Sequence, residues 1–315
     1  MYKVGVDLGG TNIVAGVIND NYEIIGRGKV KTNVPRPAEE IMSDIVYCVK
    51  KAVEDAGISI DEVESVGIGT PGSVDREKGV IEFANNLYFH HVPAAELIRK
   101  ELDVDIFLEN DANCAALGEA IAGAGKGKKS FVAITLGTGV GSGYIEDGRI
   151  IIGCNGTGGE FGHMVIKFDG EMCTCGRQGC WESYASATAL VRQTKQAMQE
   201  NPESKMWEIA GGDLNNVNGR TSFDAMRAGD SIAENVVETY IKYVAIGTIN
   251  VVNALQPEMI CFGGGICNEG ETLLSRIRKH IDEFRYSKYA DTQTEICRAT
   301  LGNDAGIIGA ALAKN

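Results

Sequence analysis

The sequence predicts an α/β protein with two related domains that face one cleft. Residues 3–31 have the pattern of strands joined by turns, and residues 131–153 repeat the same plan. The turns contain Asn, Asp and Gly, the residues that close hairpins. Each half places a glycine turn between its first two strands, and at roughly 150 residues per domain a chain of 315 residues allows two domains. The repeat therefore indicates one design used twice.

Composition and charge exclude several classes of protein. The chain carries 30 Lys and Arg against 43 Asp and Glu, a net charge of −13, whereas binding a nucleic-acid backbone favours the opposite sign. The apolar share of 44% is typical of a globular protein, not of disorder or a collagen-like repeat. No apolar run approaches the roughly 18 residues of a membrane span, and the first residues lack a signal-peptide pattern. We therefore expect a cytoplasmic protein with no nucleic-acid or membrane partner.

Helices and strands alternate between the two repeats, and the second half is richer in helix. The predicted helices show apolar residues at helical spacing, and glycine or proline marks several of their ends. They cover residues 38–56, 92–102, 112–122, 184–199, 222–227, 231–255 and 305–314, and predicted strands cover residues 63–69, 106–108 and 259–262.

The glycine-rich segment 123–127 is the expected hinge, because no linker rich in Pro or Ser separates the halves. We place a smaller N-terminal α/β domain at residues 1–122, to which a C-terminal helix at about 303–315 returns. A larger C-terminal α/β domain takes residues 123–302.

Two glycine loops have the composition of phosphate cradles. Residues 7–11 (Asp-Leu-Gly-Gly-Thr) close the first hairpin, where glycine lets backbone amides approach an anion. Residues 136–143 contain four glycines and Thr138. Neither loop is of the Walker A or Rossmann type, because another strand follows each. One such loop alone would be as consistent with an ordinary hairpin turn, whereas two together favour a nucleotide phosphate.

Residues 109–113 (Glu-Asn-Asp-Ala-Asn) place polar side chains where a strand ends and a helix begins. Helix capping explains one of them, most simply Asn110 or Asp111. The alternative is a catalytic carboxylate, since an alcohol that attacks a phosphoryl group needs an acceptor for its proton. Both interpretations are open from the residues alone.

Three cysteines crowd into eight residues, with a histidine ten residues before the first of them. The set is His163, Cys173, Cys175 and Cys180. Three thiolates and one imidazole complete a tetrahedral set for Zn²⁺, and with no position left for water the zinc would be structural. It would tie Glu160 close to Glu182. The other six cysteines lie in apolar contexts and are expected to be reduced, mostly buried thiols.

In their order along the chain, these motifs resemble the ROK family of sugar kinases and repressors. The Gly-Glu-Phe-Gly-His run of residues 159–163 and the cysteine cluster that follows it are the most specific elements. The resemblance runs from residue 4 to about residue 312 and is nearest to the bacterial ATP-dependent glucokinase group. It implies the actin-like ATPase (ribonuclease H-like) fold, in which two domains around a cleft close on the substrates.

The resemblance also implies a sugar site. Asp111 would take the proton from the sugar 6-hydroxyl, and Asn110 would bind the adjacent hydroxyl. His163 would serve twice, with one ring nitrogen on zinc and the other on the sugar. The remaining sugar-binding residues implied are Gly72, Asn86, Glu160 and Glu182. The chain departs from the family at Phe89, a position in the wall of the sugar cleft where the family often has Trp.

For the nucleotide, the resemblance assigns the ATP phosphates to the two glycine loops and the adenosine to residues 263–265. Asp7 would position Mg²⁺ through water, because Mg²⁺ keeps much of its hydration shell. The nucleotide-binding residues implied are Asp7, Gly9, Gly10, Thr11, Asn12, Thr138, Gly139, Gly264 and Gly265. The cofactors implied are ATP, Mg²⁺ and structural Zn²⁺.

The implied activity is transfer of phosphate from ATP to the 6-hydroxyl of a hexose, with glucose as the preferred substrate. N-acetylmannosamine or fructose is the alternative, because carboxylates that read hydroxyls fit any of these sugars. A sugar-responsive transcriptional regulator of the same family would need a helix-turn-helix domain before the first strand, which here begins at residue 3. A zinc-stapled carbohydrate-binding module would leave the glycine loops and Asp111 unused. The family also implies a homo-oligomer, a dimer or a tetramer.

Overall fold

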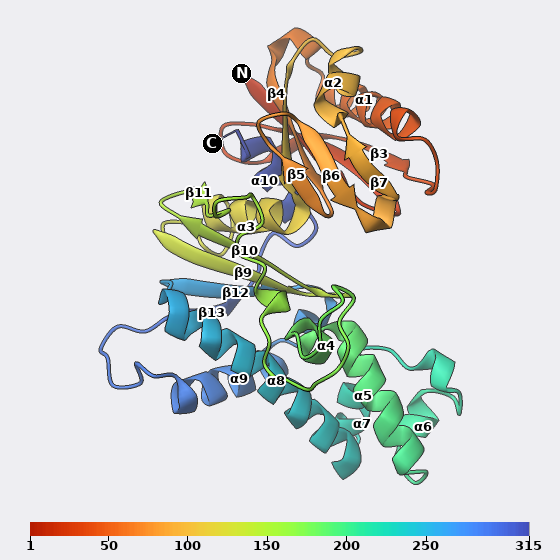
Figure 1. Cartoon of the computed structure of the whole chain (residues 1–315), viewed down its shortest axis with the longest axis vertical. Helices are drawn as coiled ribbons and strands as arrows, with labels where there is room; N and C mark the ends of the chain where they lie inside the picture. The colour runs from red at the N-terminus through yellow and green to blue at the C-terminus, as the bar shows by residue number, and fades with distance from the viewer. Residues whose placement is uncertain (315) are drawn as a thin grey trace. The chain divides into compact units, whose positions relative to one another are not determined.

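The computed structural model describes residues 1–314 and confirms the α/β class (Figure 1). Its strands are β1 (Tyr2–Leu8), β2 (Asn12–Ile18), β3 (Ile24–Lys31), β4 (Val63–Thr70), β5 (Ser73–Asp75), β6 (Val80–Ala84), β7 (Phe89–Val92), β8 (Asp105–Asn110), β9 (Ser130–Leu136), β10 (Val140–Glu146), β11 (Arg149–Ile150), β12 (Met259–Gly263) and β13 (Glu295–Arg298). Its α-helices are α1 (Ala38–Asp55), α2 (Ala94–Arg99), α3 (Asp111–Ile121), α4 (Glu182–Ala185), α5 (Ala187–Glu200), α6 (Met206–Ile209), α7 (Thr221–Arg227), α8 (Ser231–Leu255), α9 (Glu271–Phe284) and α10 (Asp304–Leu312).

Two five-stranded sheets share one strand arrangement, as the repeated sequence pattern predicts. The first has the order β3-β2-β1-β4-β8 and the second the order β11-β10-β9-β12-β13. In the first sheet, β1 pairs antiparallel with β2 and parallel with β4, and β4 pairs parallel with β8. The carboxyl ends of β1, β4 and β8 therefore meet at one edge, which is where ligands of open α/β sheets bind. A third, antiparallel sheet has the order β5-β6-β7.

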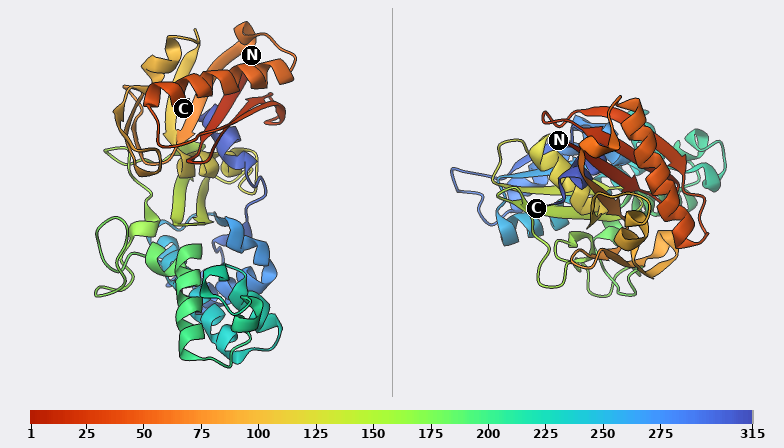
Figure 2. Two further views of the ribbon diagram at one scale, coloured as in Figure 1. Left: turned by 90° about the vertical axis from the view of Figure 1, so that its right-hand side faces the viewer. Right: turned by 90° about the horizontal axis from the view of Figure 1, so that it is seen from above.

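Helices cover both faces of the first sheet. Helix α1 packs on β2 and β3, and α10 packs on β1, β4 and α3 (Figure 2). Successive residues of β1 point to opposite faces of this sheet. Val4 and Val6 join the core beneath α1, while Gly5 lies against α10. A Cβ atom on Gly5 would lie 1.8 Å from the carbonyl oxygen of Ile307, so only glycine allows α10 to approach this closely.

The chain packs as two compact units. Unit 1 comprises residues 1–133, 143–159 and those from 299 onward, and unit 2 comprises residues 134–142 and 160–298. The domain boundaries expected from the sequence, after residue 122 and before residue 303, stay a prediction, because compactness does not define which segments move together. Among residues 1–314, no helix is long and apolar enough to cross a membrane.

Two predicted helices differ from those observed. The helix expected over residues 184–199 breaks at Ser186, whose hydroxyl accepts a hydrogen bond from the Ala189 N–H (3.1 Å) and so caps α5. The helix expected from residue 92 begins at Ala94, because Val92 ends β7 and pairs with Ile81.

Candidate functional site

The junction of β8 and α3 holds the predicted base. Asn110 caps the helix: its Oδ1 accepts hydrogen bonds from the N–H groups of Ala112 (2.9 Å) and Asn113 (3.2 Å). Its Nδ2 donates to the carbonyl oxygen of Gly72 (3.0 Å). Asn110 is therefore the N-cap that the sequence left open. Asp111, the first residue of α3, also accepts a hydrogen bond from the Ala112 N–H at its Oδ1 (2.8 Å).

Asp111 lies close enough to Asp7 for the two carboxyls to interact. The Asp111 side chain is exposed to solvent at one side but surrounded by protein elsewhere, and this desolvation raises the pKa of its carboxyl. Desolvation and then repulsion from Asp111 raise the pKa of Asp7 to about 6. Carboxyls with raised pKa values are typical of sites that accept protons near neutral pH or bind a cation.

The segment that carries Gly72 and Asn86 lies beside this junction. Gly72 has φ +89°, and a Cβ atom there would lie 1.9 Å from the carbonyl oxygen of Phe83, so no other residue fits. Asn86 is exposed and lies next to the first glycine loop, since a Cβ atom on Gly10 would be 3.5 Å from the Asn86 carbonyl oxygen. Phe89, by contrast, is 3% exposed and packs in the core of unit 1.

The first glycine loop is held through its carbonyl groups. Thr32 donates from its hydroxyl to the Gly9 carbonyl oxygen (2.6 Å) and from its N–H to the Thr11 carbonyl oxygen (3.0 Å). The Gly9 N–H bonds to the Asn12 carbonyl oxygen (3.0 Å). Within residues 1–314, the buried Asn12 Oδ1 has no hydrogen-bond partner. This loop thus offers an unused polar atom at the place where the sequence predicts a nucleotide.

Unit 2 holds the second glycine loop in place by bonds that leave the Thr138 hydroxyl accessible. The Thr138 carbonyl oxygen accepts a hydrogen bond from the Thr188 hydroxyl (2.8 Å), and the Thr138 side chain is exposed. A second hydrogen bond holds the loop at Val140, whose N–H donates to Glu182 Oε2 (2.9 Å). Glu182, predicted to bind sugar, therefore also contacts the predicted phosphate loop beside Gly139.

The predicted adenosine turn lies next to the same loop. Gly264 has φ +92°, and its α-carbon packs on Leu136, since a Cβ atom there would lie 2.4 Å from the Leu136 carbonyl oxygen. No atom of the described chain occupies the space beside Gly265 within 4 Å of a Cβ position. Unit 2 thus brings together residues 137–139 and 264–265, as one nucleotide would require.

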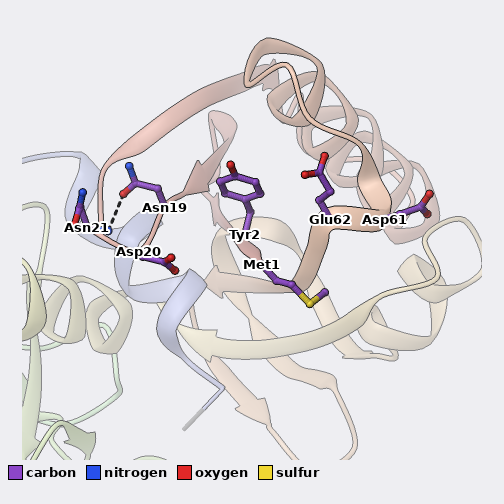
Figure 3. A pocket seen from close by; sticks show the side chains of 7 residues that line it. All are labelled: Met1, Tyr2, Asn19, Asp20, Asn21, Asp61 and Glu62. Atoms are coloured by element: carbon purple, nitrogen blue, oxygen red, sulfur yellow. Dashed lines mark hydrogen bonds between the residues drawn. The ribbon is translucent and has the colours of Figure 1, made fainter.

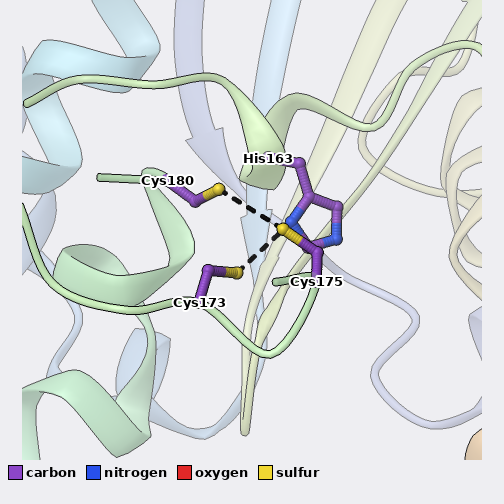
Figure 4. Close-up of side chains that lie close together, drawn as sticks. All are labelled: His163, Cys173, Cys175 and Cys180. Atoms are coloured by element: carbon purple, nitrogen blue, oxygen red, sulfur yellow. Dashed lines mark hydrogen bonds between the residues drawn. The ribbon is translucent and has the colours of Figure 1, made fainter. Parts of the chain in front are cut away.

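The four predicted metal ligands converge (Figure 4). Their donor atoms all lie within 4.8 Å of one another. The His163 Nδ1 lies 3.6 Å from the Cys173 Sγ, and the Cys175 and Cys180 Sγ atoms are 3.7 Å apart. A tetrahedral zinc with Zn–S bonds of about 2.3 Å spaces its ligands by nearly the same distance. The donor set and its spacing therefore fit Zn²⁺.

Both predicted sugar-binding glutamates flank this cluster along the chain. Glu182 Oε1 lies 3.7 Å from the Cys173 Sγ. Glu160 precedes the short helical turn that carries His163, and its carbonyl oxygen accepts the His163 N–H (3.1 Å). All nine cysteines of the described chain are free thiols; of the six outside the cluster, four are buried, Cys297 is half-buried and Cys154 is exposed.

Two hollows lie away from these residues. One, of about 560 Å³ in unit 1, is lined mainly by polar side chains (Figure 3), at Met1, Tyr2, Asn19, Asp20, Asn21, Asp61 and Glu62. The other, of about 500 Å³ in unit 2, has an apolar lining from α8 and α9. None of the predicted site residues lines either hollow.

Comparison with known proteins places the chain in a family. Residues 3–315 match the sequence profile of the ROK family. The glucokinase of Halalkalibacterium halodurans is 37% identical over 98% of this chain and 93% of its own length. The crystal structure of a ROK family glucokinase from Streptomyces griseus in complex with glucose and AMPPNP has a TM-score of 0.82 and 36% identity, covering 99% of this chain and 98% of that one. A ROK hexokinase from Thermus thermophilus gives a TM-score of 0.85 at 33% identity, covering 99% and 97%. The chain therefore belongs to the ROK family and has its two-domain, actin-like ATPase fold.

Proposed function

We propose that the chain is an ATP-dependent hexose 6-kinase that converts glucose and ATP to glucose 6-phosphate and ADP. The observation that carries the proposal is the position of Asp111. It is the first residue of α3, a helix that Asn110 caps, and its carboxyl interacts with that of Asp7. Similarity to glucokinases over nearly the whole chain supports glucose as the substrate.

Asp111 acts as the general base in this proposal. Its carboxylate accepts the proton of the sugar 6-hydroxyl while that oxygen attacks the γ-phosphorus of ATP, and the bond from this phosphorus to the β,γ-bridging oxygen breaks. The bonding electron pair leaves with ADP. Asn110 orients the adjacent hydroxyl, and its bond to the Gly72 carbonyl fixes the side chain before sugar binds.

The raised pKa of Asp7 fits a carboxylate that waits for a cation, because desolvation penalises its charge until a positive charge arrives. Bound Mg²⁺ would neutralise charge on the phosphates. Asp7 would hold its hydrated shell, and Asn12 Oδ1, unpartnered within the described residues, lies in the same loop. Gly9, Gly10 and Thr11 on one loop and Thr138 and Gly139 on the other would bind phosphate oxygens, and Gly264 with Gly265 would accept the adenosine.

The rest of the sugar site comprises Asn86, Glu160, His163 and Glu182 in this proposal. The His163 Nδ1 faces the Cys173 Sγ, so its Nε2 is the nitrogen left to bond a sugar hydroxyl. Structural Zn²⁺ on His163, Cys173, Cys175 and Cys180 would fix that ring. We further propose a cytoplasmic location, as the sequence suggests, and a homo-oligomer, a dimer or a tetramer, as the family implies.

An ADP-release assay with ATP and Mg²⁺ over a panel of hexoses tests this function. We expect glucose to give the highest kcat/KM among glucose, fructose and N-acetylmannosamine. A higher kcat/KM for either of the other two sugars would make that sugar the preferred substrate, and the proposal of a hexose kinase would stand. No sugar-dependent ADP release with any hexose would reject the kinase itself.

A further inference from the structure

Glu109 is a buried carboxylate that the proposed mechanism does not use. It lies in β8, two residues before Asp111, and is 1% exposed. Its Oε1 accepts hydrogen bonds from the Asn110 N–H (2.8 Å) and from the Asn113 Nδ2 (2.9 Å). The Glu109 carboxylate therefore shapes the turn that presents Asn110 and Asp111.

The partner of this carboxylate is Arg76, whose guanidinium forms an ion pair with it. Arg76 directly follows β5, the strand that begins next to Gly72. Because the Gly72 carbonyl accepts the Asn110 amide, the β5 segment and the β8–α3 junction are joined twice. Arg76 is 24% exposed, and desolvation lowers the pKa of its guanidinium, the side chain with the highest ordinary pKa in proteins. It stays a fixed positive charge.

Titratable groups from four segments gather at this junction. Asp7 from β1 interacts with Asp111, and the Cys114 thiol of α3 interacts with Asp111, Asp7 and Arg76. Arg76, after β5, in turn pairs with Glu109 of β8. Burial, followed by repulsion from Asp111 and Asp7, raises the pKa of Cys114, so that residue stays neutral. Helix α10 also packs on α3, but its acidic residue Asp304 pairs with Arg27. The neighbourhood thus has three carboxyls and one guanidinium.

We propose that Arg76 is a positioning residue for phosphoryl transfer, which lets the buried Glu109 carboxylate shape the catalytic turn without leaving an uncompensated negative charge beside Asp111. This inference rests on the proposed function, in which Asp111 is the base. Unlike a purely structural ion pair, the Arg76–Glu109 pair has an electrostatic signature, because each partner removed alone changes the charge near Asp111 with opposite sign.

The test measures kcat/KM for glucose against pH in Arg76→Met, Glu109→Gln and the double variant. In Arg76→Met, the unpaired Glu109 charge disfavours ionisation of Asp111. The acid limb of the pH profile of kcat/KM should therefore move to higher pH, and kcat at pH 7 should fall about tenfold. In Glu109→Gln, the unpaired guanidinium favours ionisation, so the limb should move to lower pH. The double variant should restore the wild-type position of the limb.

Arg27→Met is the matched control, because it breaks an exposed ion pair in the same unit and should leave the limb in place. A melting curve on each preparation separates stability from this signature. If Arg76→Met does not fold, Glu109→Gln and the double variant still decide. Limbs that coincide in all folded variants would overturn the inference. Failure of the proposed function is distinguishable, since the wild type would then release no ADP with any hexose. If only the role of Asp111 as base were wrong, Asp111→Asn would keep near-wild-type kcat.

Discussion

At the scale of single residues, Asp7 shows how a group that we propose to act at the Mg²⁺ site opposes stability. Its pKa of about 6 in the folded chain exceeds the ordinary 3.8, so between these values the folded state binds more protons than the unfolded state. The free energy of unfolding therefore falls as pH rises from about 4 to 6. The carboxylate that would meet Mg²⁺ destabilises the fold at neutral pH.

Asp7→Asn should remove this penalty. We expect the substitution to raise the free energy of unfolding by about 2 kcal/mol more at pH 7.5 than at pH 4, since an amide does not titrate. Urea denaturation at both pH values measures the difference. The control is Asp20→Asn, which removes one carboxylate from an exposed position. Phosphorylation of glucose by Asp7→Asn should be lost, and equal stabilisation at both pH values would contradict the account.

The residues also show where sequence reasoning stops. The sequence predicted the polar junction at residues 109–111, but Asn and Asp both cap helices, so only the folded structure shows that Asn110 is the N-cap of α3. Arg76 gave no signal, because its role depends on Glu109, which lies 33 positions away and is buried only in the folded chain. Burial of a charge is a tertiary property that no local pattern carries.

At the scale of elements, we expect the loop of residues 163–180 to depend on bound zinc for its order. We expect about one zinc per chain in protein prepared without chelator, and less in Cys175→Ala. That variant should lose both thermal stability and glucose affinity, because Glu160 and Glu182 flank the cluster. The control is Cys154→Ala, which changes another exposed cysteine outside the cluster. Wild-type glucose affinity in zinc-free Cys175→Ala would argue against the structural role.

The second glycine loop makes a separate prediction. Thr138→Val should raise the KM for ATP and leave glucose binding nearly intact, because it removes an exposed hydroxyl and keeps the backbone bond to Thr188. Steady-state kinetics and calorimetry with glucose measure the two effects. Thr188→Val is a useful comparison, since it removes the hydrogen bond that anchors the loop but keeps the Thr138 hydroxyl. Loss of glucose binding with normal ATP kinetics in Thr138→Val would show that the loop is misassigned.

Most elements with regular patterns were predicted, and the short strands with weak patterns were not; α9 is an exception. The Asn, Asp and Gly turns predicted the β1–β2 and β9–β10 hairpins. Strands β5 to β7 are short, and their turns carry no strong hairpin signal. Helix α9 was also left unassigned, although Leu273, Leu274, Ile277 and Ile281 have helical spacing and are buried. Its signal was in the sequence.

At the scale of the whole molecule, the repeated plan is the feature that sequence conveys best. Both halves place a glycine turn between the first two strands, and both five-stranded sheets have the same order relative to those strands. Which segment belongs to which unit is harder to predict. Residues 143–159, which the sequence places in the C-terminal domain, pack with the N-terminal part, because packing decides membership and chain order does not.

The central claim is that Asp111 accepts the proton during phosphoryl transfer from ATP to glucose. The measurement that tests it most directly is kcat for glucose phosphorylation by Asp111→Asn, with glucose affinity by calorimetry and a melting curve on the same preparation. Asparagine keeps the shape of the side chain and loses its basicity, so kcat should fall by about 10²- to 10⁴-fold while glucose binding stays measurable. A folded variant with near-wild-type kcat would contradict the account.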